Sequence, residues 1–243
     1  MTDHFLLGEI WEAFTIQGYK VGLLHRTTTP ATEFPNVLMS RLQVILTVEG
    51  QITSYEHVYY FYNKAGFPSH SYLFDAGQEA PVHVRFVGNQ MICQIDDDIF
   101  TETVPDDARP SYGYYPLVVT IPFTMDYRLP FTRVDDASCS IEGRAEFVSR
   151  GWEAVALEGK LLSLWRVDEY AAHHLTNQYW LDEARHIRQS KWLGAVSYWV
   201  PIREEALAGL PSKWATAATT MLESSPKTDW MSEVVAWLTG NQI

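Results

Sequence analysis

From Glu9 to Val200 the sequence is a succession of short stretches in which apolar and polar residues alternate, separated by turn residues. In the clearest stretch the apolar residues occupy even positions: Leu38, Leu42, Val44, Leu46 and Val48. Polar Arg41, Gln43 and Thr47 occupy odd positions. Because successive side chains of a strand point to opposite faces, this alternation predicts a half-buried β-strand.

Glycine-containing turns join these stretches into hairpins. Gln17-Gly18 separates Glu9–Thr15 from Lys20–Thr29, and Gly88-Asn89 separates two further strands. The last part of the meander contains Leu161–Asp168, Asn177–Asp182 and His186–Trp192. We count about ten to twelve strands, and an open sheet of that size twists and curls, which leaves a concave face to be filled.

The composition changes after Pro201. Ser212 can cap a helix whose apolar stripe is formed by Trp214, Ala218, Met221 and Leu222. Ser225-Pro226 is typical of a second helix start, followed by the stripe Trp230, Val234, Trp237 and Leu238. These stripes must be buried, and the sheet is the obvious acceptor.

The predicted fold class is therefore mainly β (α+β). We expect a large, strongly curved antiparallel sheet, a half-barrel of about ten to twelve strands, with C-terminal helices packing on it. No Ser/Gly-rich linker divides the chain, so 1–243 is predicted to be a single domain, with a β meander over 1–200 and a helical segment over 201–243.

Two segments are less regular. Pro105–Pro116 is the longest irregular stretch, and Leu117–Phe131 is apolar but interrupted by Pro122 and Pro130. Proline removes a donor from a β ladder, so the second segment is predicted to be an edge strand or a crossing loop. Further on, Arg150-Gly151 is expected to form a turn between Ser140–Ser149 and Trp152–Leu157.

Charge and hydropathy exclude some classes of partner. The formal net charge of −12 disfavours nucleic acid, because phosphate binding needs a concentrated cationic surface. No window approaches the ~18 apolar residues of a membrane span. The first residues lack a signal-peptide pattern, which favours the cytoplasm, with the periplasm as the alternative for a trimmed mature chain.

Cys93 and Cys139 lie 46 residues apart in strand-like surroundings. Their spacing matches no metal-binding motif. Buried free thiols are favoured, and a disulfide stays open.

The sequence contains no recognisable catalytic motif. His173-His174 would point to opposite faces of a strand, and Asp96-Asp97-Asp98 lacks the order of a calcium loop. No G-x-S-x-G occurs, and the glycines are spaced as turn residues. We therefore predict no catalytic residue, no metal ligand and no cofactor.

Aromatic residues are the strongest remaining signal. On predicted strands, Tyr59, Phe61, Trp165 and Trp180 could line an apolar cavity, although core packing is the commoner role of such residues. Tyr112, Tyr114 and Tyr115 occupy a predicted loop, where core packing explains aromatics poorly. These seven residues are the candidate ligand-binding set.

The succession of hairpins, Val21-Gly22 after the first turn and Tyr179-Trp180-Leu181-Asp182 before a polar final strand resemble the LolA-like group. This group comprises periplasmic lipoprotein carriers and uncharacterised bacterial relatives. The resemblance implies a half-barrel wrapped around helices, with an apolar cavity that receives acyl chains in the carriers.

Three functions follow from these patterns. The first is a non-catalytic protein that binds a hydrophobic small molecule or acyl chain in an apolar cavity. The second is a structural or assembly protein, including a homo-oligomer, that uses its sheet or C-terminal helices as an interface. The third is a hydrolase whose site is dispersed over distant strands; the sequence favours a non-catalytic protein.

Overall fold

The computed structural model describes residues 7–31, 37–48, 50–62, 68–75, 81–111, 114–192 and 194–223. The first eight strands are β1 (Gly8–Ile16), β2 (Tyr19–Pro30), β3 (Val37–Val48), β4 (Gln51–Tyr62), β5 (Pro68–Asp75), β6 (Val82–Val87), β7 (Gln90–Ile95) and β8 (Asp98–Thr103). The others are β9 (Ala108–Pro110), β10 (Arg128–Asp135), β11 (Ser140–Leu157), β12 (Lys160–Ala171), β13 (His174–Leu181), β14 (Ile187–Trp192) and β15 (Ala195–Val200). The helices are α1 (Tyr114–Thr120), α2 (Arg203–Leu207) and α3 (Ser212–Glu223).

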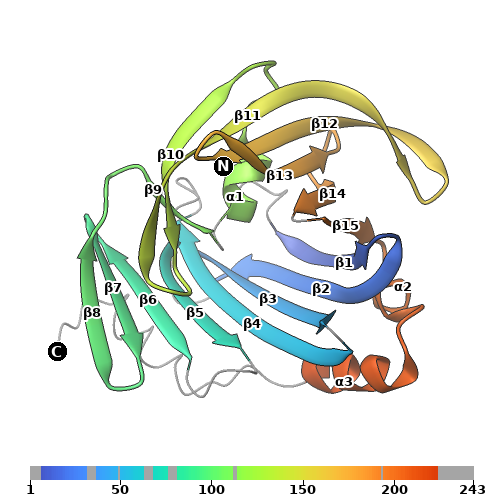
Figure 1. The fold of residues 1–243 in the computed structure, drawn as a ribbon, viewed down its shortest axis with the longest axis horizontal. Helices are drawn as coiled ribbons and strands as arrows, with labels where there is room; N and C mark the ends of the chain where they lie inside the picture. Colours follow the sequence, from blue (N-terminus) through green and yellow to red (C-terminus); the bar gives the residue numbers. More distant parts are fainter. Residues whose placement is uncertain are drawn as a thin grey trace.

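All strands within the described residues belong to one curved sheet with the order β8-β7-β6-β5-β4-β3-β2-β1-β15-β14-β13-β12-β11-β10-β9 (Figure 1). Two meanders, β1 to β8 and β9 to β15, meet where β1 pairs with β15. Neighbouring strands are antiparallel except β9 and β10. The predicted mainly β fold with a large curved sheet is confirmed, and its 15 strands exceed the ten to twelve expected.

The first hairpin forms at the turn that the sequence predicts, Gln17-Gly18. Gln17 and Gly18 connect β1 to β2 with φ angles of 51° and 81°, the left-handed conformation of a tight hairpin turn. Gly22 lies on β2 where a Cβ atom would collide with the backbone carbonyl of Ile45 on β3. Glycine is therefore required by close strand approach at Gly22, one of the positions that carried the family resemblance.

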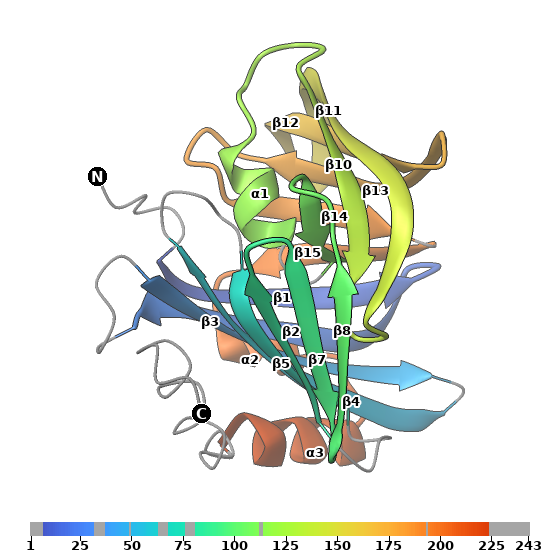
Figure 2. The same cartoon turned by 90° about the vertical axis from the view of Figure 1, so that its left-hand side faces the viewer.

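The concave face of the sheet encloses α1 (Figures 1 and 2). Six of the seven α1 residues are buried, and they pack on inward side chains such as Phe131, Phe147 and Val167. This helix corrects two predictions, the irregular stretch over Pro105–Pro116 and the start of the edge strand or crossing loop predicted over Leu117–Phe131. Tyr114 and Tyr115 are thus helical and buried rather than loop residues, and Tyr112 lies outside the described residues.

The convex face is covered by α2 and α3. Ala206 and Ala218 pack against Trp11, Leu23 and Ile45, with Met221 and Leu222 at the border. Three residues of the predicted stripe, Ala218, Met221 and Leu222, therefore do pack on the sheet. The second helix predicted from Ser225 onward lies outside the described residues.

The two ends of the sheet approach each other. Val84, Met91 and Cys93 on β6 and β7 share a cluster with Ala108 on β9 and Val134 on β10. A disulfide joins Cys93 to Cys139, with their Cα atoms 6.2 Å apart. The free thiols favoured from the sequence are therefore wrong, because the curl of the sheet brings together two residues that no local pattern relates.

One predicted turn is also wrong. Residues 140–157 form a single long strand, β11, whose register against β12 shifts between Ser149 and Gly151. Gly151 has a φ of 106°, so Arg150-Gly151 marks a β-bulge rather than a chain reversal.

Candidate functional site

The concave face contains a cavity of about 190 Å³ between the sheet and α1. Its apolar wall is formed by Phe14, Leu24, Leu42, Ile187 and Trp192. Polar side chains reach it from β1, β2, β14, β15 and α1: Glu12, Arg26, Ser190, Ser197, Tyr114 and Tyr115. An apolar hollow with a few convergent polar groups is typical of a small-molecule site.

Glu12 is the first member of a short hydrogen-bonded chain. The pairing of β1 with β15 sets Ser197 opposite Phe14 and diagonal to Glu12, and Ser197 Oγ donates to Glu12 Oε2 at 2.6 Å. The hydroxyls of Ser190 and Ser197 are 2.6 Å apart. Burial raises the pKa of Glu12, while the Ser197 hydrogen bond and the Arg26 charge oppose that rise.

This raised pKa predicts a pH-dependent stability. The folded state holds the Glu12 proton more tightly than the unfolded chain does. That contribution is therefore complete below the unfolded pKa, about 4.3, and is lost as the pH rises through the folded pKa. Glu12→Gln, which is always neutral, should become more stable relative to wild type as the pH rises from 4 to 8. Urea unfolding across this range measures the difference, with exposed Glu204→Gln as the control; a constant difference would contradict the prediction.

Arg26, on β2, lines the same cavity, and the residue is only 7% exposed. Its Nη1 donates to Tyr59 Oη, and its guanidinium carbon lies 4.3 Å from the centre of the Tyr115 ring. Within the described chain, Arg26 forms no ion pair, and its Nε has no hydrogen-bond partner. The cavity wall thus contains a buried cation that no neighbouring carboxylate neutralises by direct contact.

Helix α1 supplies two phenol groups to the same wall. The hydroxyls of Tyr114 and Tyr115 are buried and have no hydrogen-bond partner among the described residues. Burial raises the pKa of both phenols far above the ordinary value near 10, so both keep their protons at neutral pH. Each therefore presents an O–H donor to the interior.

A second buried carboxylate, Glu169 on β12, is already satisfied. It accepts hydrogen bonds from Asn177, from Tyr179 Oη at 3.2 Å and from Arg133 Nη1 at 3.3 Å. Burial raises the pKa of Glu169, against the opposing effects of Asn177 and Arg133. Because its oxygens have donors within the protein, this cluster holds the sheet together rather than facing a ligand.

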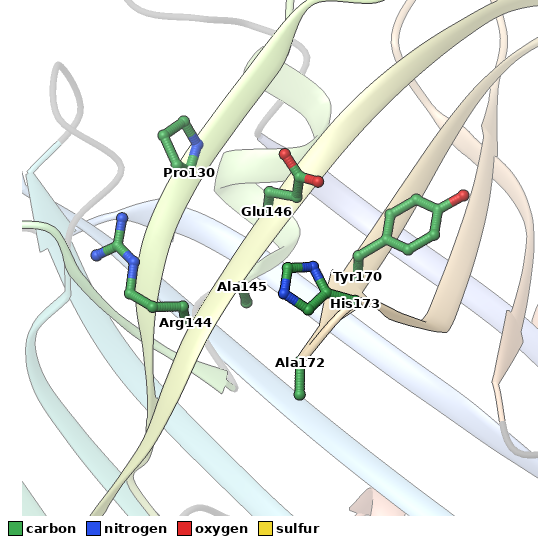
Figure 3. A pocket seen from close by; sticks show the side chains of 7 residues that line it. All are labelled: Pro130, Arg144, Ala145, Glu146, Tyr170, Ala172 and His173. Atoms are coloured by element: carbon green, nitrogen blue, oxygen red, sulfur yellow. The ribbon is translucent and has the colours of Figure 1, made fainter.

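Another hollow, of about 240 Å³, opens beside the β12–β13 turn (Figure 3). Arg144 and Glu146, which Figure 3 labels on its wall, already pair with Asp107 and Arg128 respectively. His173 also lies on this wall, with a φ of 69°, so it belongs to a turn rather than to the strand predicted from the sequence. No group of three or more potential metal ligands occurs within the residues searched, which are those the structure describes.

The sequence-predicted aromatic residues are distributed over both faces. Tyr114 and Tyr115 line the cavity, and Tyr59 adjoins it through Arg26. Phe61 and Trp165 are buried in the concave-face core, where Trp165 stacks on Phe123. Trp180 points to the opposite face of β13 from Leu181 and donates to Glu153.

The sequence reading missed Glu12, Arg26, Ser190 and Ser197. One signal was available, because Arg26 shares the parity of inward Leu24 and Glu12 shares that of inward Phe14. A charged residue in an apolar register is a candidate functional group. The two serines gave no local signal, since they join the site only through the pairing of the chain's two meanders.

Comparisons with known proteins identify the fold but no family. No protein-family model matches the chain, and no curated protein does. A beta-barrel-like protein of the domain of unknown function DUF1849 from Brucella abortus matches with a TM-score of 0.54 at 6% identity, over 79% of this chain and 94% of that one. Because the identity is so low, this similarity shows a shared fold and nothing of function.

Two further solved structures are less similar. A DUF1089 family protein from Pseudomonas aeruginosa matches with a TM-score of 0.38 at 11% identity, over 70% of this chain and 89% of that one. A protein with a YmcC-like fold from Bacteroides fragilis matches with a TM-score of 0.26 at 11% identity, over 79% and 92%. None of the three is described as LolA-like, so the supported part of the family resemblance is a beta-barrel-like, curved β-sheet fold. Of the helices that the structure describes, none has the length and apolarity to cross a bilayer.

Proposed function

We propose that the protein is a non-catalytic binder of a small hydrophobic molecule, held in the cavity on the concave face. The observation that carries this proposal is the apolar wall, in which Phe14 meets the edge of Trp192 with ring centres 5.8 Å apart. Helix α1 closes the opposite side with Tyr114 and Tyr115. Such a wall contacts an apolar ligand and removes it from water.

The volume supports a smaller ligand than a long acyl chain. A cavity of about 190 Å³ lies below the ~300–1,000 Å³ of drug-sized sites. It slightly exceeds the ~150 Å³ of an apolar cavity that takes up benzene. Scaling from benzene gives a capacity of roughly eight non-hydrogen atoms.

A hydrolase is less well supported. Ser190 and Ser197 hydrogen-bond to each other, and Ser197 donates to Glu12; within the described residues neither serine is hydrogen-bonded to an imidazole. A serine nucleophile needs a base that is itself oriented toward the hydroxyl. The assembly alternative is weakened for the described helices, because Ala206 and Ala218 already pack on the chain's own sheet.

The proposal predicts a size limit that a series of 1-alkanols from ethanol to decanol can measure. Affinity should rise about fourfold per methylene, since each buried methylene contributes about 0.8 kcal/mol. The rise should end near six carbons, when the cavity is full. Isothermal titration calorimetry or ligand-observed NMR gives the dissociation constants.

Leu42→Phe supplies the site-filling variant, because Leu42 lines the cavity. It should weaken hexanol binding by more than tenfold. Leu161→Phe makes the same substitution at a residue that is 74% exposed, and it should leave binding unchanged. Absence of binding by every alcohol, or equal affinity of wild type and Leu42→Phe, would refute the proposal.

A further inference from the structure

The polar part of the cavity wall includes three donor groups that lack acceptors. Arg26 Nε and the hydroxyls of Tyr114 and Tyr115 are buried without a hydrogen-bond partner in the described chain. All three side chains are at most 7% exposed and line the same cavity. Buried polar groups are normally satisfied, so a set of unsatisfied donors around one hollow indicates an acceptor that belongs there.

The chemistry of Arg26 restricts that acceptor. A guanidinium has five N–H donors and no lone pair, so only an acceptor can satisfy Nε. Its guanidinium carbon lies 4.3 Å from the centre of the Tyr115 ring, and its Nη1 donates to Tyr59 Oη. These two contacts hold the guanidinium in place. A fixed guanidinium fork matches the two oxygens of a carboxylate.

The nearby carboxylate does not already fill this role. Glu12 is directed to Ser197, and no ion pair joins it to Arg26 in the part of the chain that is described. Burial raises the pKa of Glu12, which reduces the negative charge that would compete for Arg26. Although the charge of Arg26 acts on Glu12 at a distance, no direct ion pair forms between them in the described chain, and Arg26 Nε is left for a partner that enters the cavity.

We infer that the ligand carries a carboxylate head group that binds the Arg26 guanidinium and the Tyr115 hydroxyl, with its apolar body against Phe14, Ile187 and Trp192. This inference rests on the proposed function, which assigns only an apolar ligand to the cavity. It adds the class of the ligand, a small amphipathic carboxylic acid in its anionic form. Arg26 would then select the head group, whereas the apolar wall would select the size.

Three six-carbon probes that differ in their polar group test the inference: hexanoate, hexanamide and 1-hexanol. Calorimetry at pH 7.5 should show hexanoate binding about tenfold tighter than either neutral probe, because hydrogen bonds to charged groups are stronger than neutral ones. Arg26→Gln should remove this preference, so that hexanoate binds no tighter than 1-hexanol to the variant. Tyr115→Phe keeps the ring and should reduce the preference severalfold.

Arg188→Gln is the matched control. Arg188 also stacks on an aromatic ring, Trp199 at 4.2 Å, and pairs with Asp182, but it does not line the cavity. It should retain the preference for hexanoate. If Arg26→Gln does not fold, Arg26→Lys keeps the charge without the fork and should lose part of the preference.

The outcomes separate the two proposals. Equal affinities of the three probes for wild type would overturn the carboxylate inference and leave the proposed function standing; Arg26 would then only hold Tyr115 and Tyr59 in place. A hexanoate preference that survives Arg26→Gln would also overturn it. Failure of all three probes to bind would refute the proposed function itself.

Discussion

Removal of the Cys93–Cys139 disulfide should lower the free energy of unfolding by about 4 kcal/mol. The bridge joins two residues with a sequence separation of 46. In the chain-entropy model, opening a loop of this length raises the entropy of the unfolded chain and stabilises it by about this amount. It also joins β7 to the turn after β10, near opposite ends of the sheet. Urea unfolding of Cys93→Ser/Cys139→Ser, compared with wild type, measures the loss.

Reduction provides the control for this prediction. A thiol reductant should destabilise wild type by a similar amount and leave the double serine variant unchanged. The cluster around Val84, Met91 and Val134 spans the same junction, so the variant should still fold, with this region exchanging its amide hydrogens faster than before. Two reactive thiols in the non-reduced wild-type protein would contradict the bridge.

We propose that the protein works in an oxidising compartment, because disulfides persist there and are rare in the reducing cytosol. The periplasmic alternative is therefore preferred to the cytoplasmic expectation drawn from the first residues. Alkylation of the protein in its native cells, followed by mass spectrometry, tests this proposal. Alkylated Cys93 and Cys139 would argue for the cytoplasm.

The sequence predicted those parts of the fold that depend on neighbouring residues. The alternation in β3, the Gln17-Gly18 turn and the stripe of α3 each arise within about a dozen residues, where periodicity reports burial directly. Helix α1 was not predicted because its residues have a low helix propensity. It contains Pro116 and the β-branched pair Val118-Val119, and it is stabilised by burial against the concave face rather than by its own sequence.

The candidate site was harder to predict because its members come from the two ends of the meander. Ser197 contacts Glu12 across a separation of 185 residues, and Arg26 meets Tyr115 across nearly 90. These contacts exist only after β1 has paired with β15 and the sheet has curled around α1. The sequence identified Tyr112, Tyr114 and Tyr115 as unusual for a predicted loop, but it gave no reason to associate them with Arg26.

Asp168→Asn should destabilise the protein by about 2–4 kcal/mol at pH 7. The Asp168 side chain is fully buried on β12 and accepts from Arg166 Nε at 2.7 Å and from Arg150 Nε at 2.9 Å. Removing one member of a buried ion-pair network leaves its partners uncompensated, which typically costs about 3–5 kcal/mol. The lower range applies here because both arginines are roughly 30% exposed and water screens them.

The pH dependence of this effect has a definite sign. Burial alone would raise the pKa of Asp168, but the hydrogen bonds from Arg166 and Arg150 outweigh it and lower that pKa below 3.8. The stabilisation is therefore present above the unfolded pKa and is lost as the pH falls through the folded value. Urea unfolding should accordingly show the gap between wild type and Asp168→Asn narrowing below about pH 4.

Asp126→Asn separates burial from charge, since Asp126 pairs with the same Arg150 at 3.8 Å but is 74% exposed. An exposed pair contributes about 0–1 kcal/mol, so this variant should remain close to wild type at every pH. If the two asparagine variants were equally stable, the Asp168 network would contribute no more than a surface ion pair. The stability of the β11–β12–β13 part of the sheet would then have to come from the apolar concave face alone, where Phe147, Val167 and Leu181 pack around α1.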